Sequence, residues 1–224
     1  PLPNETEETY YDGMKFLMDN NVKTQTYTLM LIVGTELGRD ESARVNEIKA
    51  KFRILPKQFG QYNGERVFEI EKVCVGTKTM SYQSYLNCRN YSFIVKLLGQ
   101  PVFTPIYKLI QKIGISWYDF SRAVTKTVED NSHKSQLKTL YDEFCYESHN
   151  ELFETEQEAK DFYSIEENYQ MLMKGEMGEN LLGKYSAKGL LFYNDVLGAL
   201  FEVIRAEFKE HLDPKINLIL ESSE

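Results

Sequence analysis

The sequence has few residues of the kinds that build metal centres, disulfide frameworks or nucleic-acid surfaces. Its 224 residues include three cysteines and three histidines, and 34 acidic side chains outnumber 26 basic ones, which gives a net charge of −8. Such a charge disfavours binding to nucleic acids or anionic membranes, because both attract lysine and arginine. Cys74, Cys88 and Cys145 are widely separated and odd in number, as is typical of reduced thiols. We therefore expect a cytoplasmic protein without nucleic-acid partners.

Long hydrophobic runs and the common catalytic signatures are also missing. No apolar run approaches the ~20 residues of a membrane-spanning helix, so we expect no membrane partner. There is no phosphate-binding loop, no dinucleotide-binding glycine pattern and no Ser-His-Asp order. The hydrophobic fraction of 42% and the aromatic fraction of 13% are nevertheless ample for a packed core, which argues against disorder.

The first 38 residues are expected to form one αβ unit of a parallel sheet or barrel. A loop at 1–6 precedes an amphipathic helix, whose apolar residues recur at helical spacing: Tyr10, Met14, Leu17 and Met18. The segment 22–33 ends in a continuous apolar run, which is typical of a parallel strand buried on both faces. The turn Gly34–Gly38 then ends the strand. Because one αβ unit cannot form a fold, we expect further sequence upstream.

The next element is predicted to be a β-hairpin. Asn63-Gly64 supplies the positive φ angles of a type I′ turn between the strands 59–62 and 65–71. Phe68 and Ile70 share one face of the second strand, and the side chains of Glu69 and Glu71 share the other. These two glutamates are either a carboxylate pair suited to acid–base chemistry or a solvated strand face.

From about Ser81 the apolar spacing becomes helical and stays so. We predict helices that end at Gly99 and Gly114, a third that Ser116 caps, further helices over 134–153 and 155–173, a mobile loop over 174–188, and a last helix before Asp213-Pro214. The segment 216–220 is expected to be a short strand or a docked tail. The predicted fold class is α+β or an α/β fragment, with a barrel end at 1–50, a hairpin connector at 51–80 and a helical domain at 81–224.

Several motifs resemble a known enzyme family. The segments Leu2-Pro3-Asn4-Glu5-Thr6, Leu29-Met30-Leu31 and Gly34-Thr35-Glu36-Leu37 resemble the last part of a radical S-adenosylmethionine (radical SAM) barrel. The subgroup is the one with an N-terminal cobalamin-binding domain, such as anaerobic magnesium-protoporphyrin monomethyl ester cyclase-like proteins. The runs Lys51-Phe52-Arg53, Phe68-Glu69-Ile70-Glu71 and Met80-Ser81-Tyr82 resemble the segment that follows the barrel. The resemblance is specific over about residues 1–40, looser to about 98, and absent afterwards.

The sequence departs from the family pattern in two ways. Pro1 and Asn4 stand where the family usually has glycine, although asparagine tolerates the left-handed conformation. The cluster motif Cys-x3-Cys-x2-Cys is absent, so this chain cannot hold the family's iron–sulfur cluster at that motif. The motif lies upstream of the matched segment in family members, and we expect a parent protein that carries it before Pro1. The resemblance implies S-adenosylmethionine, a [4Fe–4S] cluster and possible cobalamin use in that parent, with none bound by this chain.

The resemblance also implies where the cofactor would lie. It places Glu5 and the strand end, namely Leu31, Val33, Gly34, Thr35 and Glu36, beside S-adenosylmethionine, with apolar side chains on the adenine and backbone groups at its edge. The alternative is that 34–36 is only a turn and Glu5 only an acid at a helix start.

Other candidate ligands are the two arginines and one Cys–His pair. Arg53 and Arg89 are candidates for binding an anionic group of a substrate, or are plain surface ion pairs. Cys145 and His149 lie four apart on a predicted helix, but two ligands are too few for a metal. We assign no catalytic residue and no metal ligand.

Two functions follow from these expectations. In the first, the chain is the C-terminal part of a radical SAM enzyme, forms one pocket wall and a helical cap, and is not catalytically competent alone. In the second, it is a self-standing helical interaction or small-ligand-binding module. The expected partners are the upstream part of the same polypeptide and a second copy, because the edge of the strand at 22–33 is open unless the segment 216–220 covers it.

Overall fold

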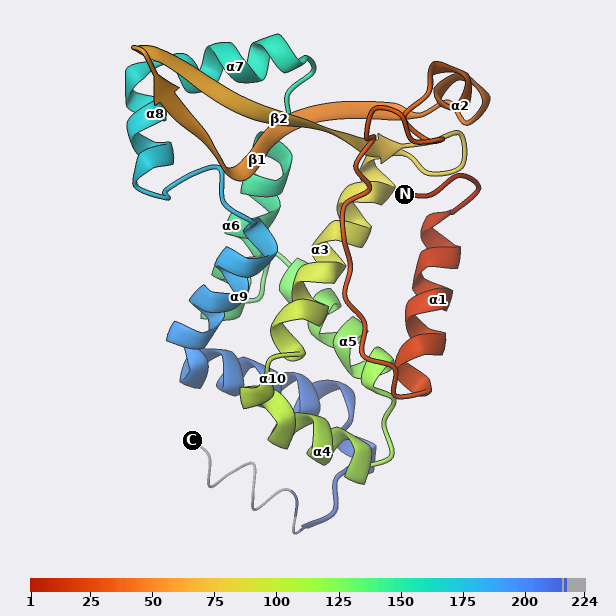
Figure 1. The fold of residues 1–224 in the computed structure, drawn as a ribbon. Helices are drawn as coiled ribbons and strands as arrows, with labels where there is room; N and C mark the ends of the chain where they lie inside the picture. The colour runs from red at the N-terminus through yellow and green to blue at the C-terminus, as the bar shows by residue number, and fades with distance from the viewer. Residues whose placement is uncertain (215, 217–224) are drawn as a thin grey trace. The chain divides into compact units, whose positions relative to one another are not determined.

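The computed structural model describes residues 1–214 and 216, which form a mixed α+β fold (Figure 1). A two-stranded antiparallel sheet is followed by helices. The elements are α1 (Glu7–Asp19), α2 (Asp40–Val45), β1 (Lys49–Tyr62), β2 (Glu65–Gly76), α3 (Tyr82–Leu98), η1 (Pro101–Phe103), α4 (Thr104–Lys112), α5 (Trp117–Glu129), α6 (Gln136–Asn150), α7 (Glu156–Ser164), α8 (Glu166–Met173), α9 (Leu181–Leu191), α10 (Tyr193–Glu207) and η2 (Lys209–His211).

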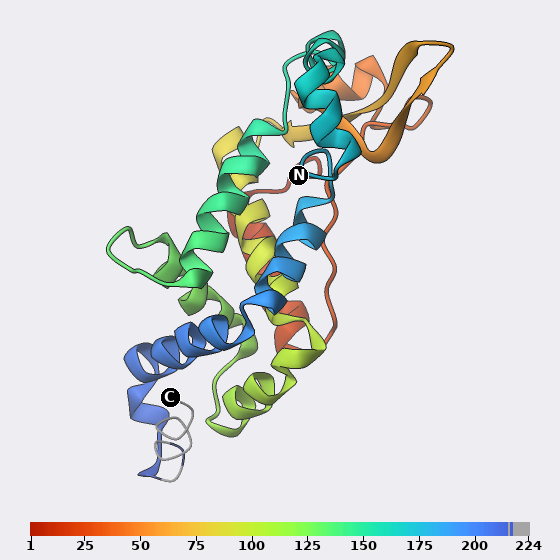
Figure 2. The same cartoon turned by 90° about the vertical axis from the view of Figure 1, so that its left-hand side faces the viewer.

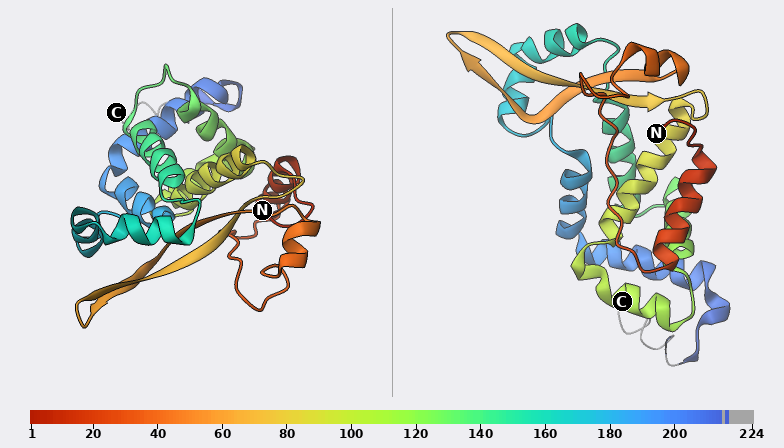
Figure 3. Two further views of the ribbon diagram at one scale, coloured as in Figure 1. Left: turned by 90° about the horizontal axis from the view of Figure 1, so that it is seen from above. Right: turned by 45° about the vertical axis from the view of Figure 1, so that its right-hand side comes forward.

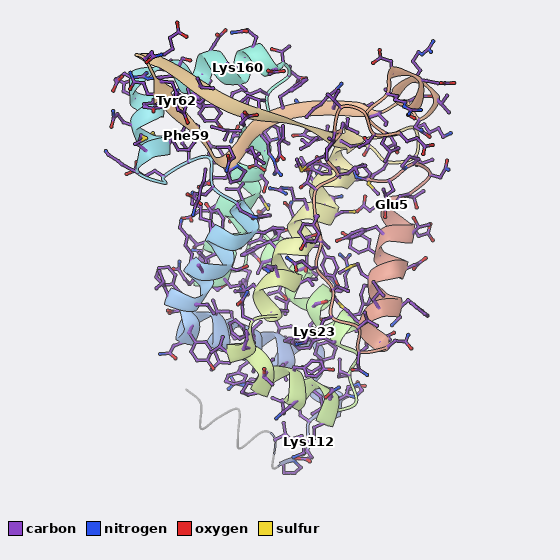
Figure 4. The ribbon with its side chains drawn as sticks, in the orientation of Figure 1. Glu5, Lys23, Phe59, Tyr62, Lys112 and Lys160 are labelled. Atoms are coloured by element: carbon purple, nitrogen blue, oxygen red, sulfur yellow. The ribbon has the colours of Figure 1, made fainter. Side chains whose placement is uncertain are left out.

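The predicted hairpin is confirmed. Asn63 and Gly64 have φ angles of 50° and 88°, as a type I′ turn requires, and Tyr62 pairs with Glu65 across the turn. The strands are longer than the sequence pattern indicated, because β1 begins at Lys49 and β2 continues to Gly76. Close to the turn, the Phe59 ring lies 6.3 Å from that of Tyr169 in α8, whereas Tyr62 is exposed (Figure 4).

The turn glycine provides a test of this hairpin. We expect Gly64→Ala to lower the free energy of unfolding by about 1 kcal/mol, because a Cβ is strained at positive φ. Gly13→Ala is the matched control: Gly13 lies within α1, and an added Cβ would meet no other atom within 4 Å, so alanine should raise stability by about 0.5–1 kcal/mol. Urea denaturation measures both, and equal effects of the two substitutions would contradict the turn geometry.

The two faces of β2 are buried at opposite ends of the strand. Near the turn, Phe68 packs with residues of β1, α7 and α8, namely Ile54, Tyr163, Tyr169 and Leu172. Near the other end, Val73 and Val75 pack with Tyr85, Leu86 and Leu152. A two-stranded ribbon twists strongly, and here an irregularity between Ile54 and Phe59 adds to the change of face. Figures 2 and 3 show α7 and α8 beside the turn half of the hairpin.

This change of face corrects the expectation for the glutamate pair. Glu69 is exposed, as the solvated reading required, but Glu71 is only 7% exposed. The two side chains share a strand face by alternation, yet the twist carries that face from solvent at Glu69 into the interior at Glu71. They are therefore not a matched pair of solvated carboxylates.

The parallel pairing predicted for the strand at 22–33 is not found among the described residues. The segment is extended, but it has a single antiparallel bridge, between Met30 and Val73 of β2. The Leu31 N–H donates to the Lys72 carbonyl at 2.8 Å, and the Cys74 N–H donates to the Leu29 carbonyl at 2.9 Å. Leu31 is buried, whereas Val33 is 95% exposed. An apolar run is buried on two faces only where other segments cover both faces. Among the described residues, β2 pairs with one edge of this segment, and Leu31 is buried whereas Val33 is not.

The helical half follows the prediction in its first part. Helix α3 ends at Leu98 beside Gly99, and the Ser116 hydroxyl caps α5 by accepting from the Asp119 N–H. The predicted helix at 155–173 is two helices, because Ile165 has an extended backbone with ψ of 133°. The predicted loop at 174–188 is wrong in its second half, where α9 begins at Leu181. The segment 216–220 lies outside the described residues except for Ile216.

The glycines of this segment explain that error. Glycine lowers helix propensity, so Gly175, Gly178 and Gly183 made the segment resemble a loop. In the fold, a Cβ at Gly189 would lie 2.5 Å from the Leu97 side chain of α3. The residue therefore allows close packing of the two helices rather than breaking one.

The chain divides into two compact units, each built from three separated stretches. Unit 1 comprises Pro1–Tyr10, Thr26–Cys88 and Cys145–Gly183; unit 2 comprises Tyr11–Gln25, Arg89–Phe144 and the chain from Lys184 onward. The boundaries at 50 and 80 expected from sequence follow chain order and differ from this division. The reason is that α7 and α8, far along the chain, complete the core of the hairpin.

Among residues 1–214 and 216, no single helix is long and apolar enough to cross a membrane. The helices Tyr82–Leu98 and Pro101–Lys112 satisfy length and composition only as a pair, and they bend by 71° at the break between them.

Candidate functional site

Glu5 lies in the turn that precedes α1 (Figure 4). Its carboxylate accepts a hydrogen bond from the Leu2 N–H at 3.0 Å, and its carbonyl accepts from the Thr79 hydroxyl at 2.7 Å. Asn4, at the position where the family usually has glycine, has a φ of 65°. These contacts fasten the loop to the segment after β2.

The turn after Leu31 closes on itself. The Thr35 hydroxyl donates to the Ile32 carbonyl at 2.7 Å, and the Gly38 N–H donates to the Thr35 carbonyl at 3.2 Å. Gly34 has a φ of 88°, which a side chain would strain. Val33, Gly34, Thr35 and Glu36 are exposed, and only Leu31 is buried. Residues 34–36 therefore do form a turn, as the alternative interpretation expected. The cofactor role of these residues remains a prediction.

Arg53 is the centre of a partly buried ionic cluster in unit 1. It lies opposite Glu71 in the sheet, and its Nε donates to a Glu71 carboxylate oxygen. Its Nη1 donates to a Glu151 carboxylate oxygen at 3.0 Å. Burial alone would lower the pKa of Arg53, but the Glu151 and Glu71 carboxylates outweigh burial and raise that pKa above its ordinary value. The guanidinium charge is thus already compensated from within the chain.

Glu151 reaches this cluster because of a backbone contact. Phe153, two residues further on, forms an isolated antiparallel bridge with Phe52 of β1. The two residues exchange both backbone hydrogen bonds, at 2.9 and 2.8 Å. The order across this antiparallel arrangement is therefore the segment at Met30, then β2, then β1, then the segment at Phe153. The bridge places Glu151 beside Arg53, the residue that follows Phe52.

Aromatic side chains border the cluster. Tyr85 packs with Val73, two residues after Glu71 on β2, and its hydroxyl is buried without a hydrogen-bond partner. The Tyr82 and Tyr85 rings stack, with centroids 6.2 Å apart. The Tyr82 hydroxyl lies 3.3 Å from His149 Nδ1, and the Lys51 ammonium lies 5.3 Å from the Tyr82 ring centroid. Tyr163 packs with Ile54, the residue after Arg53, and burial together with the Glu151 charge raises the pKa of its phenol.

Arg89 belongs to unit 2 and not to this cluster. It is buried, and its guanidinium lies 5.7 Å from the Phe144 ring centroid. The two arginines expected to bind a substrate anion therefore occupy different units, and Arg53 is engaged by two carboxylates.

Sequence reasoning missed Tyr85 and Glu151 as members of the cluster. The spacing of Tyr82 and Tyr85 on one helical face was a visible signal, but it indicated only packing. Nothing near Glu151 in the sequence indicates that Phe153 bridges to Phe52, because that contact spans about a hundred residues of chain.

The described residues do not fit an iron–sulfur cluster or another metal centre. Among residues 1–214 and 216, no three His, Cys, Asp or Glu side chains are grouped so that they could hold a metal. Cys74 and Cys88 are buried, and burial raises the pKa of the Cys74 thiol. No chemical step through such a cluster is assigned to this chain.

No protein-family model matches this sequence, and no curated protein shows significant similarity to it.

Proposed function

We propose that the chain is the C-terminal part of a radical S-adenosylmethionine enzyme, in which Glu5 and residues 31–36 form one wall of the cofactor and substrate pocket. The helical remainder caps that pocket, and the chain alone is not catalytic. One observation carries the proposal. Among residues 1–214 and 216, the apolar segment that resembles a barrel strand is bridged along one edge to β2, and no described strand pairs with its other edge.

The open edge follows from the backbone geometry. The Leu31 N–H and the Leu29 carbonyl both bond to β2, so the intervening N–H and carbonyl of Met30 point the opposite way. No strand among the described residues pairs with that side. Ile32 and Val33 are exposed at the strand end. An unpaired edge beside exposed apolar side chains suits a further strand of the same polypeptide.

The residues of this chain would then have limited roles. At the carboxyl end of a barrel strand, the Val33 side chain would pack against the adenine, and backbone groups of 34–36 would bond its edge. The iron–sulfur cluster, held by the upstream polypeptide, would supply the electron that cleaves S-adenosylmethionine. Cobalamin use remains an expectation from the resemblance alone.

The test compares this chain with a longer polypeptide that carries the Cys-x3-Cys-x2-Cys motif. We expect calorimetric titration of S-adenosylmethionine to give at least about tenfold tighter binding to the longer form. A partial pocket makes few contacts with the ligand, and these offset little of the translational and rotational freedom that the ligand loses on binding. Val33→Asp in the longer form should weaken binding about tenfold by placing a charge against the adenine. Val67→Asp, on the exposed hairpin, is the matched control and should bind normally.

Equal affinity of the two polypeptides would contradict the proposal. It would favour the second function, a self-standing interaction or ligand-binding module. Light scattering of the 224-residue chain belongs to the same experiment, because an open strand edge also pairs with a second copy. A dimer that Ile32→Lys dissociates would identify that copy as the occupant of the edge.

A further inference from the structure

Arg122 of α5 is held against two tyrosine rings in unit 2. Its guanidinium lies 4.0 Å from the Tyr11 ring centroid in α1 and 5.3 Å from the Tyr91 ring centroid in α3. These two rings meet edge to face, with centroids 5.3 Å apart. Aromatic rings attract a guanidinium electrostatically, but they do not engage its N–H fork as an anion does. The Arg122 side chain is half-buried, so part of it stays in contact with solvent.

The positive charge of Arg122 has no ion-pair partner. In the described part of the chain, residues 1–214 and 216, no carboxylate pairs with Arg122, and its charge interacts with phenols alone. Lys15, the nearby cation of α1, is by contrast bonded to Asp19 at 2.9 Å and lies 3.9 Å from Asp119. Asp12 and Asp119 are exposed, so solvent screens their charges. A half-buried cation without a counter-ion is suited to an anion from outside the chain.

A second donor lies one helical turn from Arg122. Tyr118 precedes it by four residues on α5, a spacing that places two side chains side by side on a helix. Both also border the same ring, because the Tyr118 and Tyr91 centroids are 6.2 Å apart. The Tyr118 hydroxyl has no hydrogen-bond partner among the residues that the structure describes. An anion at Arg122 would therefore have a free hydroxyl donor beside it.

We propose that Arg122 and Tyr118 form a binding site for a phosphoryl group, either free phosphate or the phosphate of a small monoester. A guanidinium fork donates to two oxygens of such a group. The third oxygen then accepts from the Tyr118 hydroxyl. The fork would occupy both oxygens of a carboxylate, which makes phosphate the better match. This site stands on contacts within unit 2 and does not depend on the proposed role of Glu5 and residues 31–36.

The experiment titrates the 224-residue chain with inorganic phosphate, glycerol phosphate and acetate at constant ionic strength. In ¹H–¹⁵N spectra, the Arg122 Nε–H gives a direct signal. We expect saturable shifts of that signal with both phosphates and at least about fivefold weaker affinity for acetate, which has less charge and lacks the third oxygen. Tighter binding of glycerol phosphate than of inorganic phosphate would identify a monoester as the ligand, and equal affinity would identify the free ion.

Tyr118→Phe separates binding from folding. It removes a hydroxyl that has no partner in the described fold, so the melting temperature should not fall, while phosphate affinity should fall about fivefold. Arg122→Lys keeps the charge but loses the fork, and should weaken binding about tenfold. Lys112→Gln is the matched control, because it removes an exposed positive charge at the end of α4 (Figure 4). It should change neither quantity.

Three results would overturn this proposal. The first is the absence of saturable shifts with both phosphates, and the second is acetate affinity equal to that for phosphate. The third is a variant pattern without site specificity, namely unchanged affinity of Tyr118→Phe or equal weakening by Lys112→Gln and Arg122→Lys. None of these results bears on S-adenosylmethionine titration of the longer polypeptide.

Discussion

Arg53→Met is expected to lower the free energy of unfolding by about 3 kcal/mol, the lower end of the range for breaking a buried ion pair. The substitution keeps much of the side-chain volume but leaves Glu71 and Glu151 without their common partner. Glu71 is the more costly of the two because its side chain is only 5% exposed. Urea denaturation, monitored through a spectroscopic signal from the hairpin, measures the loss of unfolding free energy.

Arg66→Met is the matched control on the same hairpin. Arg66 pairs with an exposed Glu166, and its guanidinium lies 4.2 Å from the Tyr169 ring centroid. Loss of an exposed pair and a cation–π contact should cost about 1 kcal/mol. Equal losses for the two arginine variants would show that the Arg53 cluster is solvated rather than buried.

A double variant identifies the cause of the loss. If unpaired carboxylates are responsible, Arg53→Met combined with Glu71→Met should recover part of the stability that Arg53→Met alone removes. If lost packing of the arginine stem is responsible, the second substitution should lower stability further. The two outcomes differ in sign and are measured by the same denaturation.

Phe144→Ala is expected to lower the free energy of unfolding of unit 2 by about 3–5 kcal/mol. Phe144 is fully buried in α6, and its ring stacks on Phe93 of α3 with centroids 4.7 Å apart. Tyr185 of α9 meets the same ring edge-on at 5.7 Å. One truncation therefore removes contacts that join three helices and leaves a cavity that rigid helices cannot fill.

Tyr146→Ala, two residues along the same helix, is the control. Tyr146 is 72% exposed, so its truncation should change stability by no more than about 0.5 kcal/mol. Both substitutions replace a large aromatic residue by alanine in one helix, so helix propensity favours both alike. A small effect of Phe144→Ala would mean that the three helices repack, contrary to a rigid aromatic core.

The register of the hairpin shows where local sequence stops being sufficient. Counting outward from Asn63-Gly64 places Arg53 opposite Cys74, because paired residues keep a constant sum along an ideal hairpin. The structure pairs Arg53 with Glu71, since β1 contains three more residues than β2 between the Ile54 and Phe59 pairs. Pro56 and the positive φ of Lys57 lie in this irregularity. Proline in a strand signals a bulge, but not its length.

The apolar run 29–33 gives a second example. Its composition indicated burial on two faces, yet burial depends on which segments lie alongside, and only β2 does so among the described residues. The turn at 34–38 was predictable because Gly34 and the Thr35 hydroxyl act within a few residues of each other. The cofactor assignment of these residues came from resemblance and remains a prediction.

The sequence by itself determined the elements whose causes are local: the type I′ turn at Asn63-Gly64, the Ser116 cap and the helical period after Ser81. Only the tertiary structure decided which face of β2 is buried, how Glu151 reaches Arg53, and why Gly189 lies within a helix. The physical reason is the distance along the chain over which each effect acts. Dihedral preferences and capping act over a few residues, whereas twist, bulge length and helix packing depend on partners far along the chain.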